Sequence, residues 1–195
     1  MKNIRIIIFL SLIFLTGCSP YIPVIKYEPT ASLEIKKSVV RTIKVGSFSD
    51  NRGTDLRWLG AVRNGFGMPI KKLFTDKLTS NVVSLAFKKA LDVRNLSTGV
   101  PQMEIQGVII KFDCSTMVNY EAHAHLRINV ISLPSQEVLF SKTYRTDSTE
   151  NGFGGGFYGG YKDLAILAQR TLNETIDKFF LDPQFTALLT SVQSN

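Results

Sequence analysis

Two histidines and a glutamate alternate along a stretch of the chain that has the pattern of a β-strand. Glu121, His123 and His125 are spaced two residues apart, so their side chains lie on one face of that strand. Imidazole nitrogens and carboxylate oxygens at this spacing can bind zinc or copper. A complete site needs further ligands, which Asp113 or Cys114 would supply if the neighbouring strand pairs suitably. The alternative is a solvated polar face, and we adopt it: the sequence predicts no metal and no cofactor.

A glycine-rich segment, residues 152–160, lies immediately before a predicted helix. Its sequence matches the G-x-G-x-x-G pattern of dinucleotide-binding loops. That function requires a parallel β-α-β unit with an acidic residue after its second strand, and no strand is predicted after this helix. The remaining interpretations are a flexible connection or a contact loop. Aromatic residues are typical interface anchors, so Phe153, Phe157 and Tyr158 are candidate partner-contact residues.

The common catalytic motifs are missing from the sequence. It contains no Gly-x-Ser-x-Gly motif, no His-Glu-x-x-His motif, and no cysteine and histidine at a recognisable spacing. Asp50 and Asp55 form a carboxylate pair in a predicted loop, where aspartates usually form turns. The sequence therefore predicts a protein that is not an enzyme and has no catalytic residues.

The N-terminus has the layout of a secretory signal. A short basic stretch, residues 1–5, precedes an apolar stretch, residues 6–14, that is too short to span a bilayer as a helix. The next four residues, Leu15-Thr16-Gly17-Cys18, resemble the bacterial lipobox, in which an aliphatic residue and two small residues precede a cysteine. The resemblance implies that residues 1–17 are removed, and that the thiol and the new amino group of Cys18 are acylated.

Acylation of Cys18 predicts stable attachment to a membrane. Several acyl chains exceed the two signals that stable anchoring needs, at about 0.8 kcal/mol per buried methylene. Ser19 follows the cysteine, and a residue other than aspartate there is typical of sorting to the outer membrane in bacteria with two membranes. We therefore expect an outer-membrane lipoprotein whose domain faces the periplasm. Cys114 then has no internal disulfide partner and is expected to be a small buried apolar residue.

Composition and charge limit the remaining classes of protein. The 195 residues, of which 44% are hydrophobic and 20% charged, suit one globular domain and exclude a disordered chain. The formal net charge of +7 would suggest nucleic acid in a cytoplasmic protein, but secretion removes that partner. The lysines could instead contact anionic lipid or peptidoglycan, or form only the hydrated face of a helix. They are Lys71, Lys72, Lys77, Lys88 and Lys89.

Three segments are predicted along the chain. Residues 1–17 are the signal peptide, residues 18–34 are the lipidated cysteine with a proline-rich tether, and residues 35–195 are a single α+β domain. Prolines favour an extended, semi-rigid chain, so the tether is expected to be a plain spacer between lipid and domain. The alternative is that this strip docks on a partner.

The order of elements predicts an α+β fold. Residues 118–133 alternate between apolar and polar side chains, which indicates a strand with one buried face. The order β-α-β-β-β-α implies an antiparallel or mixed four-stranded sheet with two helices packed on one face. A short amphipathic helix is expected at the C-terminal tail. The expected strands are 35–48, 103–112, 118–133 and 138–146, and the expected helices are 69–91 and 161–180.

Two connections matter for the candidate sites. Pro134 and Ser135 are expected to form the hairpin turn between the last two strands. Residues 49–67 are rich in glycine and turn-forming residues and are expected to be irregular. Within them, the segment from Arg52 to Phe66 is expected to contact a partner, with Trp58 and Phe66 as candidate contact residues.

Four short stretches of the chain resemble YajG-type bacterial lipoproteins and, more loosely, small α/β outer-membrane lipoproteins of the LptE type. They are the lipobox ending at Cys18 and residues 48–52, 64–67 and 86–91. The LptE type serves as a plug or assembly partner of envelope machines, so the resemblance implies binding rather than catalysis. We expect a non-enzymatic accessory or assembly subunit of a cell-envelope complex. The alternative is a lipoprotein that binds an anionic envelope glycolipid or a peptidoglycan fragment.

Overall fold

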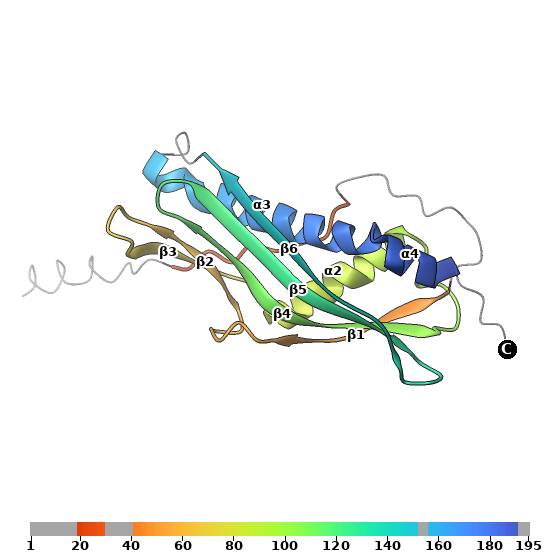
Figure 1. The fold of residues 1–195 in the computed structure, drawn as a ribbon. Coiled ribbons are helices and arrows are strands. Elements are labelled where there is room, and N and C mark those ends of the chain that lie inside the picture. Colours follow the sequence, from red (N-terminus) through yellow and green to blue (C-terminus); the bar gives the residue numbers. More distant parts are fainter. Residues whose placement is uncertain (1–18, 30–40, 152–155, 191–195) are drawn as a thin grey trace, which may run out of the picture.

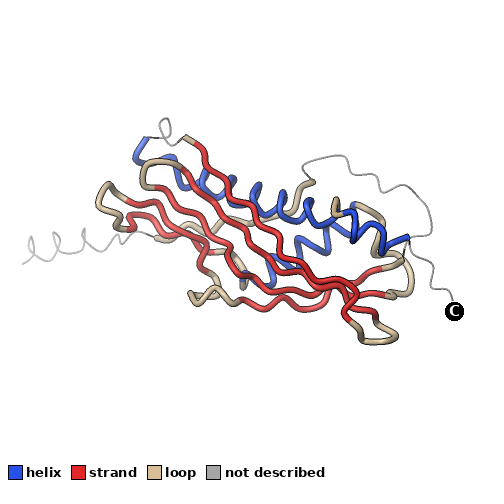
Figure 2. The backbone as a smooth tube through the Cα atoms, viewed as in Figure 1, coloured by secondary structure: helices blue, strands red, loops and turns tan. Residues whose placement is uncertain are grey.

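A mixed six-stranded sheet carries its helices on one face (Figures 1 and 2). The structure, a computed structural model, describes residues 19–29, 41–151 and 156–190. The α+β class is as predicted, but the sheet has six strands rather than four, and the predicted tail helix joins the two helices expected on its face. In chain order the elements are β1 (Ile43–Asp50), β2 (Trp58–Arg63), β3 (Pro69–Phe74), α2 (Thr79–Val93), β4 (Met103–Thr116), β5 (Tyr120–Ser132), β6 (Val138–Glu150), α3 (Gly156–Phe180) and α4 (Pro183–Thr190).

The three long strands β4, β5 and β6 form an antiparallel meander. The predicted alternation of β5 is confirmed, because every second residue from Ala122 to Val130 is fully buried beneath the helices. The residues between them point to the other face, which none of the described helices covers (Figure 1). We call this uncovered side of β4, β5 and β6 the open face.

β1 and β2 share one edge of β4, and both run parallel to it. β1 pairs with the first half of β4, from Met103 to Ile109, and β2 with its end, from Cys114 to Thr116. Arg52 fills the break between them: its guanidinium donates hydrogen bonds to the carbonyls of Trp58 and Phe112, each at 2.7 Å. A planar group with several donors can take over the ladder bonds that the interrupted strand lacks.

The helix predicted at residues 69–91 is wrong in its first half. Residues 69–74 form β3, the edge strand of a hairpin with β2, and α2 begins only at Thr79. The side chain of Asn64 accepts hydrogen bonds from the amides of Phe66 and Met68 and so closes the hairpin turn. Pro69 is tolerated because it begins an edge strand, where its missing N–H costs no ladder bond.

The irregular segment predicted at residues 49–67 contains a strand, β2, which the sequence analysis missed. The close pairing of β2 with β4 requires glycine at position 60: a Cβ built there would lie 1.8 Å from the carbonyl oxygen of Cys114 in β4. Only glycine lets the two backbones approach so closely. The strand predicted at residues 35–48 is observed as Ile43–Asp50, and residues 35–40 lie outside the described part.

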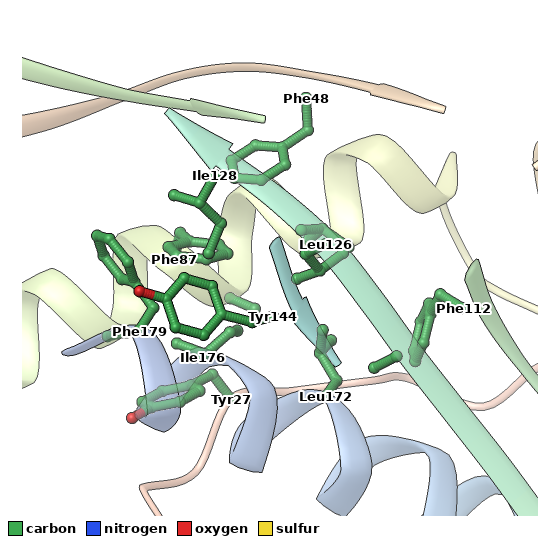
Figure 3. Packing of buried hydrophobic residues seen from close by; sticks show 14 of the residues in the cluster. Tyr27, Phe48, Phe87, Phe112, Leu126, Ile128, Tyr144, Leu172, Ile176 and Phe179 are labelled. Carbon is green, nitrogen blue, oxygen red and sulfur yellow. The ribbon is translucent and has the colours of Figure 1, made fainter. Parts of the chain in front are cut away.

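The helices bury their apolar stripes on the covered side of the sheet, as predicted for α3 and for the tail helix α4. Phe179 of α3 lies at the centre of an aromatic cluster, with its ring centroid 4.1 Å from that of Phe185 and 5.9 Å from that of Phe87 (Figure 3). Asp182 separates α3 from α4 and accepts a hydrogen bond from the amide of Gln184, as a helix N-cap does. Among the described residues, no helix has the length and hydropathy needed to cross a membrane.

Residues 19–29, part of the predicted tether, lie against the domain instead of standing clear of it. We call this segment the strap. It is extended and follows α3: Tyr21 packs edge-on against Tyr161, with ring centroids 4.7 Å apart, and the amide of Lys26 donates to the side chain of Gln169. Tyr27, near its end, is buried in the core (Figure 3). The strap is therefore extended, as its prolines predict, but it is not a free spacer.

Candidate functional site

A cluster of two imidazoles and one carboxylate lies on the open face. The Nδ1 atom of His123 lies 2.5 Å, and the Nε2 atom of His125 2.8 Å, from the same oxygen, Oδ1, of Asp147. β5 presents the histidines side by side, and the antiparallel register places Asp147 of β6 directly opposite His123. Hydrogen bonding to His123 and, to a smaller extent, to His125 lowers the pKa of the Asp147 carboxyl group.

This cluster is the group of described residues whose geometry comes closest to a metal site. The ligand atoms of His123, His125 and Asp147 all lie within 4.8 Å of one another. Two nitrogens and one oxygen are ligands that zinc and copper accept, with a further position left for water. Glu121 lies on the same face but is not part of the cluster.

The sequence suggested Asp113 and Cys114 as further ligands, and the structure places them on opposite faces of β4. Asp113 of β4 pairs with His123 in the register, but its carboxylate is not part of the cluster. Cys114 faces the core, is 2% exposed and cannot reach the open face. Burial raises the pKa of its thiol well above the ordinary range, as expected for the small buried apolar residue that the sequence predicted.

Asp147 was missed by sequence reasoning, although the signal was present. The turn at Pro134 and Ser135 was predicted, and counting outward from Ser135 by equal steps reaches His123 on one side and Asp147 on the other. A hairpin pairs residues in this symmetric way as long as no bulge intervenes. The bulge in this hairpin, between Val130 and Ile131, shifts the centre of the pairing by half a residue to Ser135, so the predicted turn places Asp147 opposite His123 to within one residue.

The predicted partner-contact residues do not form one patch. Phe66 lies at the tip of the β2–β3 turn and is 90% exposed, so it is free to contact another molecule. Trp58 is half-buried and packs edge-on against Phe74, with ring centroids 5.5 Å apart. Phe153 lies outside the described residues, and the backbone at positions 157 and 158 forms the start of α3.

Arg52, at the start of the segment predicted to contact a partner, has a structural role. Its side chain is 4% exposed and forms a two-pronged ion pair with Asp50, through Nε at 2.8 Å and Nη2 at 2.7 Å. It also donates to the hydroxyl oxygen of Thr79, the first residue of α2. The interior therefore holds Arg52 itself, while residues 53–56 and the hairpin tip at Phe66 are exposed.

A buried ionic cluster fastens the strap to the helices. The hydroxyl of Tyr27 donates a hydrogen bond to Oδ1 of Asp177 in α3, and Nη2 of Arg94 lies 2.6 Å from the same oxygen. The guanidinium also stacks over the ring of Phe180 at 4.3 Å. Burial, and then the hydrogen bond to Asp177, raise the pKa of the Tyr27 hydroxyl far above its ordinary value. Sequence reasoning had no signal for this contact, because its partners come from three distant segments.

A pocket of about 280 Å³ lies between the strap and α2. Its apolar part comes mainly from Val24 and Ile25 of the strap and from Val82 and Leu85 of α2. Its charged lining residues are three lysines and one aspartate: Lys26, Lys77, Lys89 and Asp76. The combination suits a small amphiphile with a negatively charged group.

Comparison of the sequence with models of known protein families finds no match, and comparison with curated protein sequences finds none either. Among solved structures, the fold is similar to that of protein XCC0632 from Xanthomonas campestris, of the DUF330 family. The TM-score is 0.62 at 13% identity, and the match covers 87% of this chain and 97% of that one. An identity this low shows a shared fold and nothing about activity.

Weaker likenesses involve two proteins that are named as lipoproteins. A putative lipoprotein from Caulobacter crescentus has a TM-score of 0.45 at 10% identity, with 58% of this chain and 84% of that one covered. Lipoprotein GNA1162 from Neisseria meningitidis has a TM-score of 0.30 at 8% identity, with 70% and 99% covered. These scores are too low to support a conclusion. None of the three structures is named as a YajG-type or LptE-type protein, so that resemblance stays a prediction. The lipobox and Cys18 lie outside the described residues.

Proposed function

We propose that this chain is a lipid-anchored protein of the bacterial outer membrane that faces the periplasm and acts as a non-enzymatic accessory or assembly subunit of an envelope complex. The observation that carries the proposal is the continuity between anchor and domain. The lipobox ends at Cys18, and the strap that begins at Ser19 is bonded to β3 and buried at Tyr27. An anchor joined to the domain in this way holds it at a membrane, where such a complex assembles.

We assign the open face to the protein partner. None of the helices in the described part of the chain covers it, and its exposed charges include Arg127 and Arg145 beside the His123–Asp147 pair. A polar face with both signs of charge suits a specific, reversible contact more than a permanent apolar interface. The hydrogen bonds within the cluster orient side chains that a partner could recognise.

Photo-crosslinking in living cells tests this assignment. A photoreactive amino acid at position 127, on the open face, should give a discrete protein adduct. The same group at position 166, where Ile166 is exposed on α3, should not. Mass spectrometry of the adduct identifies the partner, and Cys18→Ala should abolish the adduct by releasing the domain from the membrane. No adduct from position 127 in the lipidated protein, or equal adducts from both positions, would contradict the proposal.

The pocket beside the strap favours a second candidate function, binding of an anionic envelope glycolipid or a peptidoglycan fragment. Its lysines are placed to attract a phosphate or carboxylate, while Val24 and Leu85 offer apolar contact. Co-purification of such a molecule with the lipidated protein, lost in a Lys77→Glu, Lys89→Glu double variant, would support this function. Exposed charges are screened by salt, so binding should also weaken as salt is added.

A further inference from the structure

The strap enters the domain beside the start of β3. Tyr21 forms a parallel bridge with Leu73: its amide donates to the carbonyl of Lys72, and its carbonyl accepts from the amide of Phe74, both at 3.0 Å. Because the bridge is parallel, the chain before Tyr21 leads toward the first residue of β3, next to the β2–β3 turn. The Nζ atom of Lys71 donates to the carbonyl of Ser19 at 2.5 Å and fixes that direction.

The lipid attachment point cannot lie far from this place. One peptide bond joins Ser19 to Cys18, and consecutive α carbons are about 3.8 Å apart. A lipid on Cys18 would therefore bring the membrane within about one residue of the position at which the strap meets β3. The anchor leaves almost no free chain between the bilayer and this end of the sheet.

Two turns with exposed apolar side chains lie at the same end. Val62 of β2 pairs with Thr116 of β4, so the β2–β3 turn and the β4–β5 turn are neighbours. The exposed apolar residues of these turns are Phe66 at 90%, Met68 at 57%, Met117 at 56% and Val118 at 58%. We call this group the turn end; it lies at the left of Figure 1, beside the first turns of α3.

Apolar exposure alone does not distinguish the turn end from the opposite end of the molecule. There Val100 is 85% and Val138 60% exposed. The position of Ser19 makes the difference, because the strap begins at the turn end and runs away from it along α3. The two ends are well separated, since the 13 residues of β5 span about 40 Å at roughly 3.3 Å per residue. One end can therefore touch a bilayer while the other stands clear of it.

We propose that the turn end docks on the membrane that holds the lipid anchor, with Phe66 and Met68 from one turn and Met117 and Val118 from the other buried among the lipid headgroups. The inference rests on the proposed lipidation of Cys18. The anchor supplies the main attachment, and the four apolar side chains orient the domain. β4, β5 and β6 then point away from the bilayer, and the open face remains accessible from the side.

Tryptophan fluorescence in vesicles tests this orientation. In a Trp58→Phe background, which removes the only native tryptophan, single tryptophans are introduced as Phe66→Trp, Met117→Trp or Val100→Trp. The third variant is the matched control, an exposed apolar position at the opposite end. Each lipidated mature protein, residues 18–195, is reconstituted into vesicles of phosphatidylethanolamine and phosphatidylglycerol whose acyl chains are brominated near the headgroup.

The expected result is a roughly twofold loss of fluorescence at positions 66 and 117, because side chains about 5–10 Å deep in the interface meet the bromines, and no loss at position 100. Vesicle flotation measures the anchor separately. If the protein floats but neither 66 nor 117 is quenched, the orientation is wrong although the anchor holds, and Phe66 is then free for a protein partner. Quenching at 100 would also overturn the orientation. Failure to float would overturn the anchor and with it the proposed function.

Discussion

The two faces of β5 share one backbone but differ in the burial and polarity of their side chains. On the covered face, Ala124, Leu126 and Ile128 are fully buried against the helices, whereas on the open face His125 and Arg127 meet solvent. Side chains one position apart in sequence therefore contribute to different tasks. The covered face provides most of the free energy of folding, whereas substitutions on the open face should cost little stability; the open face is the one we propose for binding.

The largest effect that would test this difference is expected at Asp177, on the covered side. Asp177→Ala leaves the guanidinium of Arg94 and the hydroxyl of Tyr27 buried without their acceptor. Removing one partner of a buried ion pair costs about 3–5 kcal/mol of unfolding free energy. Urea denaturation measures the loss. Asp147→Ala on the open face is the control, with an expected change within about 0.5 kcal/mol. Equal losses at both positions would remove the distinction between the faces.

A pair of neighbouring residues sharpens the same comparison. Leu126→Ala opens a cavity in the core and should cost about 2–5 kcal/mol of unfolding free energy. Arg127→Ala, one residue further and on the other face, should change it by less than about 0.5 kcal/mol. Thermal unfolding followed by circular dichroism measures both. If Arg127→Ala proves as costly as Leu126→Ala, the open face also carries stability, and its assignment to a partner loses support.

Acid should weaken the covered side through Asp182. Burial tends to raise the pKa of this carboxyl group, but hydrogen bonds from Lys142, Tyr144 and the amide of Gln184 outweigh it and lower the pKa from 3.8 to about 2. A lowered folded-state pKa stabilises the protein above pH 4, and this stabilisation is lost as the pH falls from about 4 to about 2. The contribution is about 2 kcal/mol.

Denaturation from pH 6 to pH 2 measures this contribution by comparing the natural protein with Asp182→Asn. The variant should be less stable at neutral pH, and the difference between the two should shrink as the pH falls. Two curves that stay parallel would show that Asp182 does not carry the acid sensitivity.

The smallest effect is expected on the open face. His123→Gln with His125→Gln should return the pKa of Asp147 toward its ordinary value, since hydrogen bonds to the imidazoles lower it. Nuclear magnetic resonance of the carboxyl carbon follows this titration, and the thermal midpoint should hardly move. Calorimetric titration with zinc shows whether the same three side chains also bind a metal. An unchanged Asp147 titration in the double variant would mean that the cluster does not form.

The sequence predicted well those parts of the fold whose hydrophobic pattern is compatible with only one type of secondary structure. The alternation of β5 and the apolar stripe of α3 each fix both the element and its buried face. The pattern of residues 69–74 is compatible with two types of secondary structure, because Ile70, Leu73 and Phe74 suit a helix as well as an edge strand. The turn closed by Asn64 decides between them, and its side-chain hydrogen bonds are hard to foresee without the partner strand.

The candidate sites divide in the same way. His123 and His125 were identified because their spacing is local, and Asp147 could have been added from the predicted hairpin. The strap could not have been placed on the domain, because Tyr27 meets Asp177 and Arg94 across long stretches of chain. A single buried side chain or ion pair that joins distant segments leaves no periodic trace in the sequence.

The strap has a mechanical consequence for a domain held by lipid. A pull on Ser19 acts first on the hydrogen bond that its carbonyl accepts from Lys71, and then on the two hydrogen bonds that join Tyr21 to β3. Only after they yield does tension reach Tyr27, whose hydroxyl is bonded inside the core. With the proposed lipid on Cys18, the strap would peel from β3 and lengthen the chain between membrane and domain while the sheet stays closed.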